Sequence, residues 1–156
     1  MVIEASVEID RPPEHVFAWV SEPDLAAQWV PNVVAAKAHG ELRLGAETHT
    51  LIEFAGQRVD ATGRVTGYSP PWRFEETVEY LDIRSVQEAT LERLEGNRTH
   101  LTLRIQVEVP SRGPRFVSRL FGGVERRRLG RALAKLKRLV EDAAPPPTSD
   151  DVWTYD

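Results

Sequence analysis

Glu76 is the residue whose type and position favour chemistry most. It lies between Phe74 and Val78 in a segment that alternates as a β-strand does, so its carboxylate should share a face with those apolar side chains. A carboxylate there is costly unless it is protonated, paired or hydrogen-bonded, and burial would raise its pKa. A general acid or base acting on an enolisable ketone needs such a group. Alternatively, a bulge turns Glu76 outward beside Glu75, or an arginine pairs with it for structural reasons.

Other catalytic groups are scarce. The chain has no cysteine among its 156 residues, which excludes a thiolate nucleophile, cysteine-ligated zinc, iron–sulfur clusters and disulfides. The four histidines, His15, His39, His49 and His100, all fall on predicted outward faces. His39 and Glu41 lack a third ligand, so we expect no metal site and no cofactor. No Gly-x-Ser-x-Gly, His-Glu-x-x-His or Gly-x-Gly-x-x-Gly motif is present, so the chemistry narrows to carboxylate and hydroxyl groups or to none.

The elements that must position these groups are mainly β-strands. A strand is predicted over residues 2–9, followed by a helix that begins at two prolines and a short helix over 25–29. The spacing in the first helix predicts an apolar face of Pro13, Val16, Phe17 and Val20. Between residues 33 and 110, short alternating runs are separated by turn residues, and these short connections predict an antiparallel meander. The expected strands are 33–39, 46–55, 58–67, 72–81, 84–94 and 99–109. A long helix is expected over 115–142.

Strand alternation predicts which side chains face the interior. The small inward residues of the segment 58–67 should leave room there, and threonine and tyrosine hydroxyls could supply polar contacts. The segment 84–94 alternates poorly, so we expect a β-bulge in it. The inward residues expected from three strands are Thr48, Thr50, Ile52 and Phe54; Val59, Ala61, Gly63 and Val65; and Trp72, Phe74, Glu76, Val78 and Tyr80.

The long helix carries two apolar stripes that do not line up. One comprises Val117, Leu120, Phe121 and Val124, and the other comprises Leu129, Leu133, Leu136 and Val140. Gly122 and Gly123 lie within the first stripe, and each glycine in a helix interior costs about 1 kcal/mol relative to alanine. We therefore expect a break there, with residues 115–121 forming a separate turn or short helix that closes a cavity mouth, and the regular helix starting near Val124.

The predicted order of strands and helices is similar to that of a known superfamily. The chain resembles the START/Bet v 1-like (SRPBCC) superfamily, and most of all its bacterial polyketide cyclase/dehydrase-like members, over residues 1–142. The segments that carry the likeness are Ile9–Phe17, Pro23–Leu25 with Gln28, Trp29 and Pro31, Val65–Pro71, Asn97–Leu103 and Leu133–Glu141. The resemblance implies an α+β helix-grip fold: a seven-stranded curved antiparallel sheet wrapped around a long C-terminal helix, with two short helices after the first strand.

The inward faces carry more apolar surface than polar groups, which favours a binding module. The hypothesis is that a hydrophobic small molecule of polyketide, lipid or quinone type binds between the sheet and the C-terminal helix. The first alternative is an enzyme, a polyketide cyclase/dehydratase in which Glu76 and hydroxyl groups assist aldol closure and dehydration. The predicted ligand-binding residues are Trp29, Thr48, Thr50, Ile52, Phe54, Ala61, Gly63, Trp72, Phe74, Val78, Tyr80, Val117, Leu120, Phe121 and Val124. The same aromatic side chains could simply pack under the helix.

Charge is segregated along the chain. Residues 112–138 hold 10 of the 20 Lys and Arg residues and one acidic residue, although the net charge is −4. The basic helix face could be a solvated surface, or it could dock an acidic carrier protein or an anionic membrane surface as an interaction protein would. Nucleic acid is not expected, because no aromatic residue lies between 122 and 138 to stack on bases. The proposed docking residues are Arg126, Arg127, Arg128, Arg131 and Lys135.

The limits of the domain follow from composition. Residues 1–142 should form one domain, a monomer or homodimer, and residues 143–156 should be an acidic, proline-rich disordered tail. The N-terminus alternates apolar and acidic residues and lacks a basic segment followed by an apolar one. No apolar run approaches the roughly 20 residues that span a bilayer. We therefore expect a soluble, cytoplasmic protein.

Overall fold

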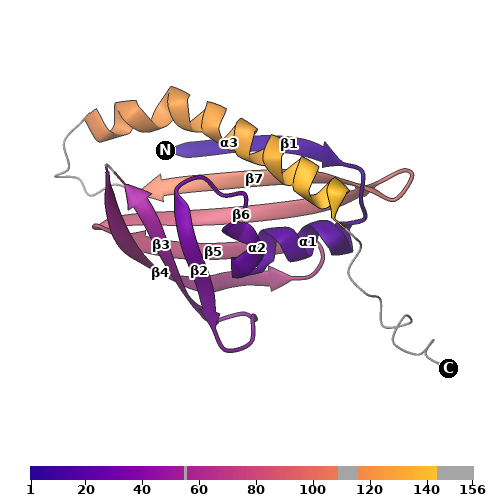
Figure 1. Cartoon of the computed structure of the whole chain (residues 1–156), viewed down its shortest axis with the longest axis horizontal. Helices are drawn as coiled ribbons and strands as arrows, with labels where there is room; N and C mark the ends of the chain where they lie inside the picture. The colour runs from indigo at the N-terminus through magenta and orange to yellow at the C-terminus, as the bar shows by residue number, and fades with distance from the viewer. Residues whose placement is uncertain (55, 109–115, 144–156) are drawn as a thin grey trace.

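One antiparallel sheet organises the fold. The computed structural model describes residues 1–54, 56–108 and 116–143, without the side chains of Phe54 and residues 116–125. Seven strands lie in the order β1-β7-β6-β5-β4-β3-β2, and every neighbouring pair is antiparallel (Figure 1). The strands are β1 (Val2–Ile9), β2 (Val33–His39), β3 (Glu47–Phe54), β4 (Gln57–Ser69), β5 (Arg73–Tyr80), β6 (Ile83–Leu94) and β7 (Arg98–Glu108). They agree closely with the predicted segments.

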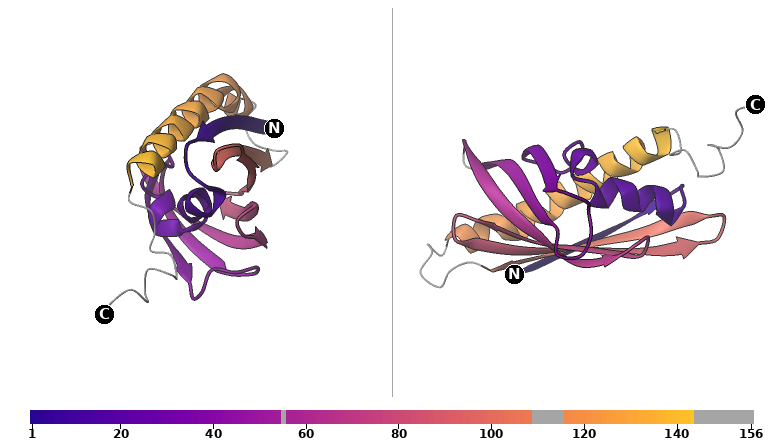
Figure 2. Two further views of the ribbon diagram at one scale, coloured as in Figure 1. Left: turned by 90° about the vertical axis from the view of Figure 1, so that its right-hand side faces the viewer. Right: turned by 90° about the horizontal axis from the view of Figure 1, so that it is seen from below.

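All three helices lie on the concave side of the curved sheet (Figure 2). They are α1 (Pro13–Ser21), α2 (Pro23–Ala26) and α3 (Phe116–Asp142). In α1 the residues Pro13, Val16, Phe17 and Val20 are buried, as the spacing predicts, and prolines occupy the first turn, where a missing N–H is tolerated. The second helix begins two residues earlier than expected, at Pro23. The predicted helix-grip α+β architecture is confirmed.

The core lies between α3, α1 and the β1 end of the sheet. Leu133 and Leu136 of α3 are buried in one cluster with Ile9, Val16 and Leu101. The second predicted stripe of α3 therefore faces the sheet, since Leu129 and Val140 are buried as well. Burial of apolar surface at about 25 cal/mol per Å² makes this contact a large part of the stability of the fold.

Polar contacts fix the C-terminal end of α3 to the turn that follows β1. Lys137 Nζ donates to the Glu8 carbonyl at 2.9 Å and to Glu141 Oε2 at 2.7 Å. The backbone N–H of Asp10 donates to the same carboxylate oxygen at 3.1 Å, and the Arg11 guanidinium donates to the Glu141 carbonyl. The end of the helix is thus held by both backbone and side-chain hydrogen bonds.

Two sequence predictions about local irregularities are wrong. The helix α3 continues without a break from Phe116 to Asp142, so Gly122 and Gly123 do not end it. The 27-residue helix tolerates the free-energy cost of a glycine pair, because the buried stripe in its C-terminal half stabilises it. Likewise β6 pairs with β5 and β7 without a register shift, so it carries no bulge. The bulges are in β4, between Val65 and Gly67, and in β2, between Val33 and Ala35.

The anchoring stripe can be tested with a neighbouring pair of substitutions. Leu136→Ala should lower the free energy of unfolding by about 2–5 kcal/mol, because it leaves a cavity at a fully buried position. Lys135→Ala, at the exposed adjacent position, should change it by less than about 0.5 kcal/mol. Equilibrium urea denaturation measures both, and equal effects of the two substitutions would contradict this packing.

Candidate functional site

Glu76 faces the interior of the sheet. It pairs across the sheet with Val65 on β4 and with Gln87 on β6, and Val65 is buried. Its neighbour Phe74, two residues away on β5 and hence on the same face, packs edge-on against Phe17 of α1 at a ring-centroid distance of 6.4 Å. The outward alternative is wrong, because no bulge rotates β5 outward. Arg73, the arginine nearest in sequence, pairs with Glu75 and Glu88 on the opposite face, and no described arginine is recorded as a partner of Glu76.

Glu76 belongs to a strip of the concave face that solvent can reach. Directly opposed residues of antiparallel strands share a face, so Ile105, Gln87 and Glu76 form one row across β7, β6 and β5. We call these three residues the central row. Gln87 is exposed, and Ile105 and Glu76 are partly exposed. The flanking rows, Leu103–Ala89–Phe74 and Val107–Ser85–Val78, are buried.

The Thr48 hydroxyl lies beside Glu76. Thr48 on β3 pairs with Gly63 on β4, and its side chain is buried, with 4% of its surface exposed. Burial raises the pKa of the Glu76 carboxyl above 4.5, and the nearby Thr48 hydroxyl offsets part of this rise. The hydroxyl nevertheless makes no hydrogen bond of normal geometry within the described part of the chain. The two groups therefore form a polar point on a mostly apolar face.

Most predicted inward residues face the interior. Ala61, Val65, Phe74, Val78 and Thr48 are buried, and Thr50, Ile52, Val59, Gly63 and Tyr80 are partly buried on the same face. Trp29 is also buried, and its indole N–H donates to the Trp19 carbonyl at 3.0 Å. The inward residues bring polar and apolar groups together along β3, β4 and β5, while Trp29 belongs to the helical side of the core.

Trp72 is the exception, because it is not buried. Its side chain is 45% exposed, and it lies in the turn before β5. The Trp72 N–H donates to the Ser69 carbonyl at 2.8 Å, and the Arg93 guanidinium lies 5.7 Å from the centre of its ring. Trp72 therefore makes a surface cation–π contact.

Several predicted site residues lie outside what the structure describes. These are the side chains of Phe54, Val117, Leu120, Phe121 and Val124. Their role as ligand contacts stays a prediction. So does the proposed tail, of which residues 144–156 are not described.

Gln87 is the residue that alternation did not place. Polar and apolar residues alternate poorly in the segment 84–94. The reason is that Gln87 lies on the concave face between Ser85 and Ala89, while Val86 lies on the convex face. The signal in the sequence that could have identified Gln87 is a polar residue that interrupts an otherwise apolar face. In contrast, the four histidines lie off the concave face, as predicted: His49 Nε2, for example, is 3.1 Å from Asp60 Oδ1 on the outer side of β3 and β4.

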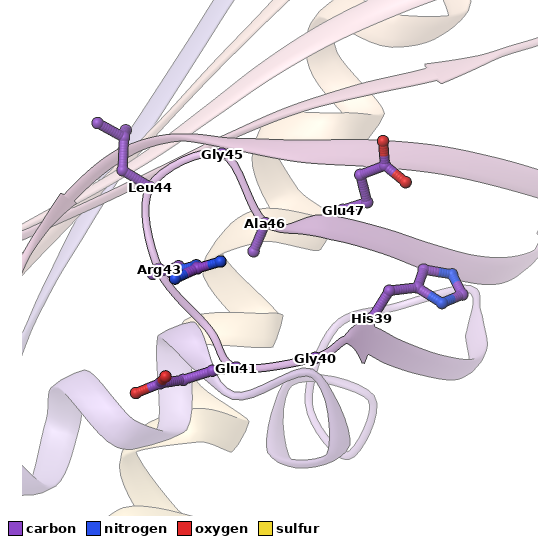
Figure 3. A pocket seen from close by; sticks show the side chains of 8 residues that line it. All are labelled: His39, Gly40, Glu41, Arg43, Leu44, Gly45, Ala46 and Glu47. Atoms are coloured by element: carbon purple, nitrogen blue, oxygen red, sulfur yellow. The ribbon is translucent and has the colours of Figure 1, made fainter.

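A pocket lies at the connection between β2 and β3, away from the central row (Figure 3). Most of its side chains are polar or charged, and the Leu44 side chain points away from it. None of the predicted ligand-binding residues lines it. The lining residues are His39, Gly40, Glu41, Arg43, Leu44, Gly45, Ala46 and Glu47. Within the described residues, no three His, Asp or Glu side chains are placed to hold a metal ion.

Comparison with known proteins identifies the family. A family model described as "Polyketide cyclase / dehydrase and lipid transport" matches residues 1–141. The chain belongs to this family. The resemblance noted from the sequence is therefore confirmed. No curated protein matches the chain in sequence.

Solved structures confirm the fold across nearly the whole domain. An aromatase/cyclase from a Streptomyces species matches with a TM-score of 0.77 at 15% identity, covering 90% of this chain and 93% of that one. Ara h 8.0201 matches with a TM-score of 0.68 at 12% identity, covering 92% and 99%. A protein from Rhodobacter sphaeroides matches with a TM-score of 0.71 at 18% identity, covering 92% and 93%. At these identities the likeness establishes the shared Bet v 1-like architecture.

The basic face of α3 is exposed where its side chains are described. Arg126, Arg127, Arg131 and Lys135 are exposed, and Arg131 and Lys135 lie on the side of the helix away from Leu133 and Leu136. The partner predicted for this face stays a prediction. Within the described residues, no helix is both long and apolar enough to cross a bilayer.

The environment of Glu76 can be tested by the pH dependence of stability. Because its folded-state pKa is raised, Glu76 favours folding below the ordinary carboxyl pKa, and that contribution is lost as pH rises through the raised value. Glu76→Gln removes this dependence. The free energy of unfolding of the variant relative to wild type should therefore increase from pH 4 to pH 7, as measured by urea denaturation at several pH values.

Glu79→Gln is the matched control, since Glu79 lies exposed on the opposite face of β5. It should not reproduce the increase. A Glu76→Gln difference that stays constant over this pH range would show that the carboxyl is not desolvated.

Proposed function

We propose that the concave face of the sheet binds a hydrophobic small molecule. The observation that carries this proposal is the central row: Ile105, Gln87 and Glu76 remain accessible between two rows that are buried. A sheet face that served only as core would be covered there too, since protein interiors are close-packed. The family description, which includes lipid transport, supports the same class of ligand.

The surroundings of the central row define what would fit. Apolar side chains of β5, β6 and β7 flank it, and Phe74 and Tyr68 add two aromatic rings whose centroids are 6.4 Å apart. Burying a ligand's apolar surface against these groups supplies affinity of about 25 cal/mol per Å², while few polar groups fix its orientation. A flat, largely apolar molecule of polyketide, lipid or quinone type matches this composition.

Binding can be tested with N-phenyl-1-naphthylamine, a neutral probe that fluoresces in apolar surroundings. Gln87→Trp places an indole over the central row and should weaken binding by about tenfold, equivalent to about 1.4 kcal/mol. Thr90→Trp puts the same ring on the opposite, convex face of β6, where Thr90 is also exposed, and should leave affinity unchanged. Equal affinity in both variants and in wild type would place the probe elsewhere.

A cyclase/dehydratase activity is the second candidate, favoured by the raised pKa of Glu76 on the same strip. Its carboxylate would take a proton from a carbon between two carbonyls. The enolate carbon would then form a bond to a second ketone carbon, whose oxygen takes up the proton. Loss of that hydroxyl with a neighbouring proton releases water and leaves a carbon–carbon double bond. Holding the chain so that these carbons approach would supply much of the acceleration.

This second candidate predicts a separation of binding from turnover. With a synthetic poly-β-ketone thioester, Glu76→Gln should lower the rate of cyclised product formation at least 100-fold, as expected when a general base is removed. Its affinity for N-phenyl-1-naphthylamine should stay within about twofold of wild type. Product analysis by liquid chromatography and mass spectrometry measures the rate. No cyclised product above the uncatalysed background from wild-type protein would leave binding as the function.

A further inference from the structure

Thr48 carries a buried hydroxyl that makes no hydrogen bond of normal geometry in the described structure, although the Glu76 carboxyl lies beside it. Its Oγ1 atom has no hydrogen-bond partner among the described residues, although only 4% of the residue's surface is exposed. An unsatisfied buried hydroxyl is destabilising, and valine, of the same shape, would avoid this cost. A ligand group placed beside this hydroxyl would supply the missing hydrogen bond.

Gly63 makes room for this hydroxyl, because a side chain at this position would overlap it. A Cβ atom at position 63 would overlap Thr48 Oγ1, and it would lie 3.3 Å from the Glu76 carboxyl carbon. Both polar groups thus converge above Gly63, and only a residue without a side chain permits this approach. Thr48 and Gly63 are directly paired, while Glu76 is opposite Val65, one inward position further along β4.

We propose that Thr48, Gly63 and Glu76 form a polar subsite that binds a hydroxyl group on an otherwise apolar ligand. A hydroxyl both donates and accepts, so it can donate to a Glu76 carboxylate oxygen while accepting from the Thr48 Oγ1–H. A hydrocarbon offers neither protein group a hydrogen-bond partner. A ligand carboxylate would meet the Glu76 carboxylate, and two negative charges in partly buried surroundings repel. This inference rests on the proposed function and specifies the ligand class.

The experiment compares three ligands of similar shape, each displacing N-phenyl-1-naphthylamine: 2-naphthol, naphthalene and 2-naphthoate. Thr48→Val should lower the ratio of 2-naphthol to naphthalene affinity about tenfold, since it removes one hydrogen bond and keeps the shape. Gly63→Ala should lower the same ratio by displacing the Thr48 hydroxyl. Thr62→Val, at an exposed position on the outer face of β4, is the matched control and should leave the ratio unchanged.

Two further measurements separate a binding role from a structural one. Thr48→Val should raise the melting temperature of the ligand-free protein or leave it unchanged, because an unpaired hydroxyl is lost. Glu76→Gln should raise the affinity for 2-naphthoate at least fivefold at a pH where the urea measurements show the Glu76 carboxyl to be ionised, since it removes the like charge. A large loss of stability in Thr48→Val would instead assign the hydroxyl to the fold and overturn the proposal.

The outcomes distinguish the subsite from the binding site as a whole. If the probe binds wild-type protein but Thr48→Val and Gly63→Ala leave the naphthol-to-naphthalene ratio unchanged, the subsite is refuted and the hydrophobic site stands. If neither the probe nor any of the three ligands binds wild-type protein, the proposed function itself is refuted.

Discussion

Leu133 and Leu136 of α3 pack together with Ile9 and Leu101 into fully buried surroundings at the β1 end of the sheet. This contact uses one half of a single helix to cover one side of a seven-stranded face. A helix is about 10 Å wide, whereas neighbouring strands are about 4.8 Å apart, so one helix covers only two or three strands. The other strands of the concave face must be covered by something else, or remain partly open.

The accessible central row follows from this geometry. The short helix α1 covers the Phe74 end of β5 through Phe17, and between that contact and α3 the row of Ile105, Gln87 and Glu76 is left accessible. The fold therefore tolerates a carboxyl group on its inner face, because the strip is neither dry core nor open surface. Such an intermediate environment shifts the Glu76 pKa upward without requiring a buried counter-ion. The incomplete cover of the concave face therefore explains both the accessible central row and the raised pKa of Glu76.

Sequence patterns predicted the strands, the α1 face and the inward direction of Glu76 because alternation records which face of a strand is covered. Val59, Ala61 and Val65 show this clearly on β4. Patterns are less informative where a residue departs from that rule for a local reason. Trp72 precedes its strand in a turn, and Gln87 puts an amide on an inner face that is open to solvent. The pairing of Thr48 with Glu76 depends on how strands are offset across the sheet, which one sequence does not specify.

The bulge between Val33 and Ala35 makes the β2 edge of the sheet irregular. β2 is an edge strand, and the free backbone groups of such a strand are a template for pairing with another chain. Irregular register and the exposed Lys37 make this edge a poor template. The irregular edge thus makes β2 a poor partner for a further strand from another chain.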